Sequence, residues 1–345
     1  MTYPNVIQPI SFSCPITVAV LYYRGNTNDG EDSMHCAKGI TESLKKSGHR
    51  VKKVAVTKKN WKKAVETPAD VVFNLVEDDL WDLYGKVGLR LEKLGRAQVG
   101  HDTKNFFYTL RKAWVKRKMD RMNIATPPFK IFNRRSKITQ VRALEYPIIV
   151  KPSQQHAGNG ISQDSVVIDQ SELEERVKYL FNQYPGEVIA EEYVNGREIH
   201  VTLLGNGKQV MALPFCEIGF GGDFKDNWDV YTYEAKWDQK SWEYWDARIS
   251  APAKLSKELR EKIRKLAHKA YQAFGCRDVA RMDIRINEKD QPFIVDVNIN
   301  PSLNYYDQQD ATLASVYALG WTYDQFIETI VAISYKRVYK TLPKK

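Results

Sequence analysis

The chain has 345 residues, 43% of them apolar and 12% aromatic, which is enough to fill two or three small hydrophobic cores. Its longest early apolar run, residues 16–23, is far shorter than the roughly 18 to 20 residues that a membrane helix needs, and no basic residue precedes it. We therefore expect a globular, multidomain, cytoplasmic protein with neither a signal peptide nor a membrane span.

The four cysteines are scattered, form no CxxC pair and have no histidine cluster beside them. This spacing does not fit a zinc site or a disulfide framework, and it favours reduced thiols in a cytoplasmic protein. The cysteines are Cys14, Cys36, Cys216 and Cys276.

The formal net charge is +10, and basic residues concentrate in segments 52–63, 111–118 and 134–137. Such an excess favours an anionic ligand or partner, although lysine runs on helices are more often simply solvated faces. The sequence contains no zinc-finger spacing, RNP sequence or arginine-rich repeat, so we do not expect a nucleic-acid partner.

Taken in chain order, the first hundred residues alternate apolar runs of strand length with amphipathic helical stretches. This rhythm predicts a parallel, Rossmann-like sheet. Asp32 and Asp79 are expected to cap the two helices, and Gly48 and Gly95 are expected to end them. The expected elements are a strand at 16–23, a helix at 33–47, strands at 51–56 and 71–75, and a helix at 80–94.

A second module begins after a long basic helix, expected over 103–123, because Pro127 and Pro128 cannot continue it. From Val188 the pattern changes to hairpins, which predict a mainly antiparallel sheet. The expected elements are strands at 129–132, 148–150 and 166–168, a capping-box helix from Ser171, hairpin turns at 195–196 and 205–207, strands at 279–287 and 292–298, and covering helices at 256–274 and 323–339.

The strongest cluster of chemically useful residues lies on two strands joined by a short turn. Arg281 and Asp283 are on the first strand, and Asp296 and Asn298 are on the second. Residues two apart on a strand share a face, so the four side chains can meet across the hairpin. Two carboxylates and a carboxamide suit Mg²⁺ with substrate phosphates better than they suit zinc or a calcium cage. A solvated hairpin with a cross-strand salt bridge is the alternative, and it would add only about 1 kcal/mol of stability.

Residues 300–303, Asn-Pro-Ser-Leu, directly follow this hairpin. The chain must leave the sheet there, and it can direct backbone N–H groups toward an oxyanion. This adjacency favours a functional role for the hairpin.

Lys151 ends an expected strand and is followed by the glycine-bearing segment 156–160, His-Ala-Gly-Asn-Gly. Such a loop can lay backbone N–H donors over phosphates while the lysine supplies a point charge. The spacing is not that of a Walker loop, and a surface loop between two strands would look the same.

A third segment begins at Val188 as a buried strand, turns polar at 191–194, and continues into an alternating strand that carries Glu198 and His200. Backbone N–H and C=O groups there could bind an adenine, and Glu198 could accept from ribose hydroxyls. Acidic residues beside hairpins are otherwise common. We expect His200 to face a side of the sheet or solvent, and we assign it no catalytic role.

In this order, the segments resemble the ATP-grasp superfamily, specifically its D-alanine–D-alanine ligase branch, over roughly residues 15–335. Residues 73–77 and 100–104 are similar to the end of that branch's first-domain sheet and to the entry of its ATP-grasp module. The resemblance implies an α/β (α+β) fold with a Rossmann-like N-terminal domain followed by a two-subdomain ATP-grasp fold. The implied units are residues 1–100, a small subdomain at 101–187, and a C-terminal subdomain with the metal site at 188–345.

The resemblance also implies roles for individual residues. Lys236 is similar to the lysine that contacts the γ-phosphate, and Arg281 with the backbone N–H near Ser302 would stabilise a tetrahedral intermediate. Asp296 replaces the more usual glutamate of the metal site. The residues implied to hold ATP are Lys104, Lys151, Glu191, Glu192, Tyr193, Val194, Glu198 and Lys236. Those implied to hold two Mg²⁺ ions, with Mn²⁺ as an alternative, are Asp283, Asp296 and Asn298.

Several positions depart from the family's pattern. Ala157 and Trp237 stand where a serine and a tyrosine help to fix the first D-alanine, so that hydroxyl network cannot form. Asp307 stands where a serine receives the carboxylate of the second D-alanine. In a poorly solvated site its charge would repel that carboxylate by on the order of a few kcal/mol. The glutamate-containing signature after the first strand is also missing, and residues 24–31 take its place.

We therefore expect an ADP-forming carboxylate–amine ligase that uses ATP and Mg²⁺ and works through an acyl phosphate. Its substrates are expected to be small amino acids, peptides or amines, with a donor or acceptor other than plain D-alanine. Authentic D-alanine–D-alanine ligase is the nearest alternative, and an ATP-binding regulator without turnover is another. The resemblance also implies a homodimer.

Overall fold

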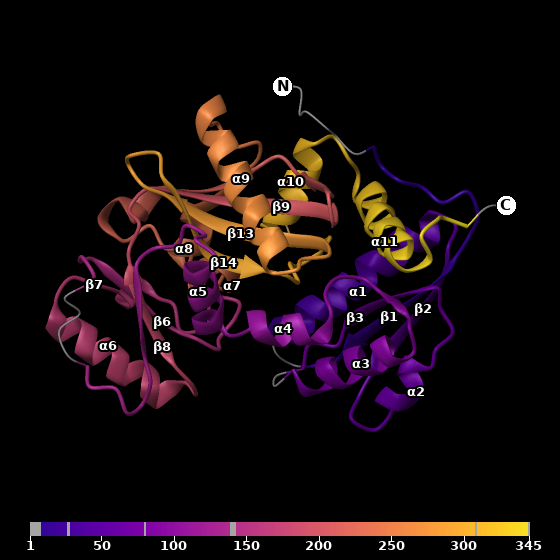
Figure 1. Ribbon diagram of the computed structural model, residues 1–345, viewed down its shortest axis with the longest axis horizontal. Coiled ribbons are helices and arrows are strands. Elements are labelled where there is room, and N and C mark those ends of the chain that lie inside the picture. The colour runs from indigo at the N-terminus through magenta and orange to yellow at the C-terminus, as the bar shows by residue number, and fades with distance from the viewer. Residues whose placement is uncertain (1–7, 26–27, 79–80, 139–142, 308, 344–345) are drawn as a thin grey trace.

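The structure is a computed structural model that describes residues 8–25, 28–78, 81–138, 143–307 and 309–343. Within these residues the strands form three sheets, one parallel and two antiparallel. Figure 1 shows the parallel sheet and the small antiparallel sheet at opposite ends of the molecule, with the six-stranded sheet between them. Among the described residues, no helix has the length and apolar character required to cross a membrane.

The parallel sheet has the strand order β2-β1-β3-β4 and confirms the expected Rossmann-like domain. Every residue of β3 is buried, because helices α1, α3 and α11 (Tyr323–Tyr339) pack against this strand. The elements of this domain are β1 (Thr17–Tyr23), α1 (Asn28–Lys46), β2 (Arg50–Val56), α2 (Trp61–Val65), β3 (Val71–Leu75), α3 (Asp82–Lys93) and β4 (Ala97–Gln98).

Helix α1 begins earlier than expected, so the assignment of Asp32 as its cap is wrong. Asp32 lies inside the helix, and its carboxylate accepts hydrogen bonds from Ser302 Oγ at 3.1 Å and from Asn304 Nδ2 at 2.7 Å. The sequence pattern missed the first turn because Gly30 and the polar residues around it are poor helix formers. The side chain that was expected to cap the helix therefore contacts the segment that follows β14 (Pro292–Asn298).

The glycines expected to end the first two long helices do so. Gly48 and Gly95 follow α1 and α3 with φ values of +85° and +62°, a conformation that glycine adopts without steric cost. The expected cap Asp79 lies outside the described residues, and α3 begins at Asp82.

The small antiparallel sheet has the order β5-β8-β6-β7, and α6 packs against it. Because β8 lies between β5 and β6, we propose that the small subdomain continues through Glu192 and does not end at residue 187. Asp169 caps α6 by accepting from Glu172 N at 2.9 Å, so the cap expected at Ser171 is wrong. The elements are β5 (Phe129–Phe132), β6 (Ile148–Pro152), β7 (Val166–Val167), α6 (Gln170–Gln183) and β8 (Val188–Glu192).

The single basic helix expected over 103–123 is in fact two helices. The break lies at Arg111, whose φ of −99° and ψ of 91° are extended. The second helix is fixed at its start, where Lys112 N donates to Ser153 O at 2.9 Å. As a result, the Lys112 ammonium lies beside the six-stranded sheet and pairs with Asp296. The two helices are α4 (Thr103–Thr109) and α5 (Lys112–Arg121).

The six-stranded sheet has the order β12-β11-β9-β13-β14, with β10 paired to β9, and all its pairs are antiparallel, as expected. Two strands, β11 and β12, and the short helices α7, α8 and α10 were not expected. Each spans eight residues or fewer, too short to show a clear period. The elements are β9 (Arg197–Asn206), β10 (Gln209–Ala212), β11 (Cys216–Phe220), α7 (Tyr233–Trp237), α8 (Trp242–Asp246), β12 (Ala247–Ser250), α9 (Lys257–Ala273), β13 (Asp278–Ile286), β14 (Pro292–Asn298), α10 (Ala311–Ala318) and α11 (Tyr323–Tyr339).

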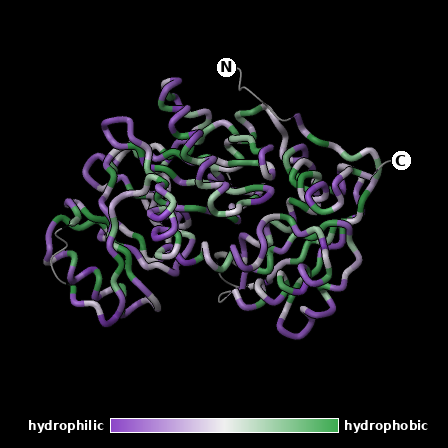
Figure 2. Tube along the Cα trace, in the orientation of Figure 1, coloured by the Kyte–Doolittle hydropathy of each residue, from purple (hydrophilic) through white to green (hydrophobic). Residues whose placement is uncertain are grey.

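The C-terminal helix α11 shares a core with the N-terminal sheet. Ile327 and Ile330 are fully buried in the same hydrophobic cluster as Val18 and Phe73. Helix α11 also contacts β9 and β13 of the six-stranded sheet. Figure 2 shows hydrophobic segments along the strands of the sheets and hydrophilic segments on many of the connecting loops. Burial of apolar surface therefore joins the two ends of the chain.

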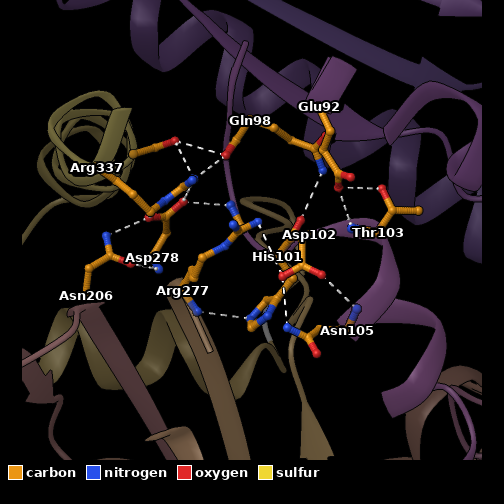
Figure 3. Close-up of polar contacts among 12 residues, drawn as sticks. Glu92, Gln98, His101, Asp102, Thr103, Asn105, Asn206, Arg277, Asp278 and Arg337 are labelled. Atoms are coloured by element: carbon orange, nitrogen blue, oxygen red, sulfur yellow. Dashed lines mark hydrogen bonds and ion pairs between the residues drawn. The ribbon is translucent and has the colours of Figure 1, made fainter. Parts of the chain in front are cut away.

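A buried polar network also ties the N-terminal domain to the rest of the chain (Figure 3). The carboxylate of Asp278 is fully buried, accepts from Gly100 N at 2.9 Å and Asn206 Nδ2 at 2.8 Å, and pairs with Arg337 at 2.8 Å. Arg337 also donates to Gln98 O at 2.5 Å. The network joins the end of β4, the six-stranded sheet and α11, so it fixes the modules between which the site forms.

Candidate active site

Two adjoining cavities share the β13–β14 hairpin as a common wall. The larger, of about 280 Å³, is also lined by α1, by the end of β3 and by the glycine-bearing loop after β6. The smaller, of about 110 Å³, is also lined by β6 and β8 of the small sheet. The residues that line both cavities are Lys112, Ile161, Tyr231, Lys236, Asp283 and Asp296.

The hairpin brings together the four residues that the sequence pattern placed there. In the strand register, Arg281 is opposite Asn298 and Asp283 is opposite Asp296. The carboxylate of Asp283 accepts from Arg281 Nε and from Asn298 Nδ2, each at 2.8 Å. Two carboxylates and an amide therefore face the junction of the two cavities.

Each of these carboxylates is stabilised in its charged form by a neighbouring cation. Burial alone would raise the pKa of Asp283, but Arg281 and, to a smaller extent, His200 hold that pKa below its ordinary value. The side chain of Asp296 is 28% exposed. Its partial burial also favours a higher pKa, yet Lys112 holds the pKa of Asp296 well below its usual range. Both carboxylates are therefore ionised at neutral pH.

The donor set fits Mg²⁺ bound jointly with phosphates, and it does not form a metal cage of protein ligands alone. Asp283 and Asp296 face each other on neighbouring strands, with Asn298 beside them. Within the ranges that the structure describes, no group of three or more histidine, cysteine, aspartate or glutamate side chains is arranged to hold a metal ion. Mg²⁺ commonly takes one or two carboxylates and completes its shell with water and substrate phosphates.

A buried ionic network stands at the smaller cavity. Glu191 is 1% exposed and pairs with both Lys116 and Lys151. Burial would raise the pKa of Glu191, but the two ammonium groups hold it below its ordinary value. Burial also lowers the pKa of Lys116 to about 8, against the attraction of Glu191. Glu191 is therefore ionised and shared between the two lysines, of which Lys151 also lines the smaller cavity.

Arg285 orders the other side of the smaller cavity. Its guanidinium donates to Val194 O at 3.0 Å and to Tyr193 Oη at 3.2 Å, and it pairs with Glu198 at 3.2 Å. The other oxygen of Glu198 lies 2.9 Å from His200 Nε2. Both oxygens of the Glu198 carboxylate are therefore held by neighbouring side chains, which fix its position.

Lys236 lines both cavities from the short helix α7, and burial lowers the pKa of its ammonium group. The next residue, Trp237, donates from Nε1 to Ala157 O at 2.8 Å. Gly158 has a φ of +86°, and a Cβ added there would lie 3.1 Å from the backbone of Tyr233. The glycine-bearing loop therefore packs closely against α7, where a side chain would have a strained φ and would crowd the backbone.

All but one of the residues expected at the site line one of the two cavities. The exception is Lys104, which lies on the exposed face of α4 near the ring of Tyr108. The helix break at Arg111 places Lys112 at the site instead. The expected residues that line a cavity are Lys151, Glu191, Glu192, Tyr193, Val194, Glu198, Lys236, Trp237, Arg281, Asp283, Asp296, Asn298, Ser302 and Asp307.

Among the lining residues that were not placed there from the sequence are Lys112, His200, Arg285 and Asp310. His200 faces a side of the sheet, as expected, but it is 2% exposed and that side is a cavity wall. The alternation of residues along β9, which puts His200 on the face of Glu198, could have revealed this. No such signal marks Asp310, because it begins the unexpected helix α10.

A family model described as "D-ala D-ala ligase C-terminus" matches residues 119–332, which is more than half of the chain. The chain belongs to this family. The match spans the small sheet, the six-stranded sheet and most of α11, and so includes both walls of the smaller cavity.

Curated relatives of this D-alanine–D-alanine ligase family member extend the likeness over most of its length. A D-alanine–D-alanine ligase of Methylacidiphilum infernorum is 27% identical over 323 residues, 94% of this chain and 97% of that protein. Another, of Halalkalibacterium halodurans, is 28% identical and covers 93% of this chain and 99% of its own. An uncharacterized protein of Sinorhizobium fredii, y4sG, is 29% identical over 78% of this chain and 76% of its own.

Solved structures share the fold of this family member. A D-alanine–D-alanine ligase from Bacillus anthracis, solved with ATP, superimposes with a TM-score of 0.75 at 20% identity, covering 94% of this chain and 99% of the other. The corresponding ligase from Coxiella burnetii gives a TM-score of 0.72 at 17% identity, with coverages of 94% and 95%. The expected ATP-grasp fold is confirmed. The chain is an ADP-forming ATP-grasp ligase, an enzyme class that forms carbon–nitrogen bonds.

Proposed function

We propose that this ligase uses ATP and Mg²⁺ to convert a carboxylate donor into an acyl phosphate, which an amine acceptor then attacks to form an amide. The observation that carries the proposal is the facing pair Asp283 and Asp296, which lies where the two cavities meet. ATP in the smaller cavity would then direct its γ-phosphate toward substrates in the larger one.

The residues of the smaller cavity suit a nucleotide. Lys112, Lys151 and Lys236 line it and can contact phosphates, and residues 191–194 form one edge. Glu198, held at both oxygens, can accept from ribose hydroxyls with little loss of side-chain freedom. Lys112 and Lys236 line both cavities, so we assign the triphosphate to them and withdraw Lys104 from this role.

The chain's own groups also suit the acyl-transfer step. Arg281 lines the larger cavity and keeps its charge, since the carboxylate of Asp283 outweighs the effect of burial on its pKa. Together with the backbone N–H near Ser302 it would stabilise the oxyanion of the tetrahedral intermediate. Losing one such donor typically costs about 3 kcal/mol of barrier. Bound Mg²⁺ would neutralise phosphate charge, and Asp283, Asp296 and Asn298 are the residues that would hold it.

The substrates are proposed to differ from plain D-alanine at one or both positions. Ala157 and Trp237 contact each other through the Trp237 Nε1–Ala157 O hydrogen bond and offer no side-chain hydroxyl to an amino-acid donor. Asp307 brings a negative charge to the same cavity. The relatives named D-alanine–D-alanine ligase support an authentic D-alanine–D-alanine ligase equally well. The chain keeps Arg281 together with the three proposed metal ligands of the hairpin, which disfavours a regulator that binds ATP without turnover.

The proposal predicts ADP release that requires ATP, Mg²⁺ and a carboxylate–amine pair, with the matching amide seen by mass spectrometry. D-alanine alone is tested first, and then pooled amino acids, peptides and amines. Asp283→Ala and Asp296→Ala are each expected to lower turnover at least roughly hundredfold while leaving the circular dichroism spectrum unchanged. Asp120→Ala, at an exposed position on α5, is the matched control.

Each outcome of this experiment points to a different conclusion. A D-alanine dipeptide would identify the authentic ligase. Full activity of both hairpin variants would refute the metal assignment. ATP binding without turnover in every pool would support the regulator.

A further inference from the structure

We propose that Asp307 and Asp310 form an acceptor subsite that selects an amine carrying a second positive charge. This inference rests on the proposed ligase function and names the substrate class of its larger cavity. Both residues line that cavity, and nothing in the family comparison assigns Asp310 a role.

The two carboxylates are held by the backbone and keep capacity to accept further hydrogen bonds. Asp310 is 6% exposed and caps α10, with one oxygen accepting from Leu313 N at 2.8 Å. Asp307 accepts from Gln309 N at 2.8 Å through one oxygen. Throughout the described ranges, no basic side chain lies within ion-pair distance of either carboxylate.

The positive charges of the larger cavity are concentrated at its hairpin end. Three lysine or arginine residues are found in its lining. Lys112 pairs with Asp296 and Arg281 pairs with Asp283, while Lys236 is attracted mainly by Asp283. Arg281 also exerts an attraction on Asp310, but its guanidinium is bonded to Asp283. The subsite of Asp307 and Asp310 therefore keeps a negative charge that a cationic ligand can compensate.

A third acceptor, the side chain of Gln309, lies between the two aspartates in the sequence and lines the same cavity. The amide of Gln309 is oriented by its Nε2, which donates to Tyr244 O at 3.1 Å. Its Oε1 is buried and has no hydrogen-bond partner among the described residues. A buried acceptor without a partner is costly, and an ammonium group brings three donors and no acceptor. The chemistry of this subsite thus matches an ammonium and opposes the free carboxylate of an amino-acid acceptor.

Calorimetric titration tests the subsite without any knowledge of the donor. The full chain, loaded with Mg²⁺ and a non-hydrolysable ATP analogue at pH 8, is titrated with three matched probes. These three-carbon amines are 1,3-diaminopropane, propylamine and 3-aminopropanoate, which carry a second ammonium, no second charged group and a carboxylate, respectively. We expect the diamine to bind at least about tenfold more tightly than propylamine, and the amino acid to bind most weakly.

Substitutions then locate the selectivity. Asp307→Asn and Asp310→Asn are each expected to reduce the diamine-to-propylamine affinity ratio at least about tenfold, whereas Asp120→Asn, which removes an exposed carboxylate, should leave it unchanged. Asparagine can still cap α10, so Asp310→Asn tests charge and not folding. A preference for 3-aminopropanoate, or a ratio equal in all variants, would overturn the inference.

A separate readout distinguishes this inference from the proposed function. Hydroxylamine, a small nucleophile that needs no second charge, is offered with ATP, Mg²⁺ and the amino-acid pool, and hydroxamates are measured. Hydroxamate formation together with unselective amine binding would refute the subsite and keep the ligase. Selective diamine binding without any hydroxamate would support the subsite and count against acyl-phosphate formation.

Discussion

Asp310 combines a structural role with an electrostatic cost. Burial raises its pKa to about 7, and the charge of Asp307 adds to that effect against the hydrogen bond from Leu313. An aspartate in an unfolded chain has a pKa of about 3.9. Between these two values the folded chain holds a proton that the unfolded chain has lost, so stability must fall as the pH rises from about 4 to 7.

Asp310→Asn is therefore expected to stabilise the ligand-free chain by on the order of 2 to 4 kcal/mol at pH 8 and by only about 1 to 2 kcal/mol at pH 5. Asparagine resembles the protonated acid and keeps the cap of α10. Thermal unfolding of both proteins across this pH range measures the difference, with Asp120→Asn as the control. A stability difference between the two proteins that does not change with pH would contradict the raised pKa of Asp310. Stabilisation combined with weaker diamine binding would be the usual trade-off at a functional site.

At the scale of elements, the network around Asp278 holds α11 against the N-terminal domain and the six-stranded sheet. Asp278 is fully buried, and Arg337 is its ion-pair partner. Removing one partner of such a pair leaves a buried charge that is only partly compensated, here by Gly100 N and Asn206. The neighbouring basic residue on the same helix, Lys336, is exposed.

Arg337→Ala is expected to cost about 3 to 5 kcal/mol of the free energy of unfolding, measured by denaturant titration. Lys336→Ala removes the same charge from the same helix and should change the free energy by less than about 0.5 kcal/mol. If both substitutions changed the free energy of unfolding equally, the buried network would contribute no more to stability than the charge of an exposed lysine.

The elements found from the sequence are those with a clear period or a clear boundary. Strand β3 and helix α11 match their expected ranges, because one is an apolar run interrupted only by Asn74 and the other has a capping box at its start. Helix α10 was missed because it is short and apolar on all sides. The break between α4 and α5 was missed because nothing in the local composition marks Arg111. Its conformation accompanies the backbone hydrogen bond between Lys112 and Ser153, a contact between distant segments.

At the scale of the whole molecule, the cluster on the β13–β14 hairpin could be predicted because Arg281, Asp283, Asp296 and Asn298 lie close together in the sequence. The remaining site residues come from modules that only the fold brings together. Lys112 reaches Asp296 across 184 positions, a relation that no local pattern contains. The order of segments nevertheless identified the family and the ATP-grasp fold before the site could be assembled.

The transfer of oxygen from the donor to phosphate tests the central claim most directly. An amino-acid pool labelled with ¹⁸O in its carboxylates is incubated with ATP, Mg²⁺ and amines, and the released inorganic phosphate is examined by mass spectrometry. The acyl-phosphate mechanism predicts one ¹⁸O atom in each phosphate. One oxygen of the donor carboxylate becomes bonded to phosphorus, and it leaves with the phosphate when the amine attacks the acyl carbon. Release of ADP with unlabelled phosphate would mean that water attacks ATP, and it would contradict the account.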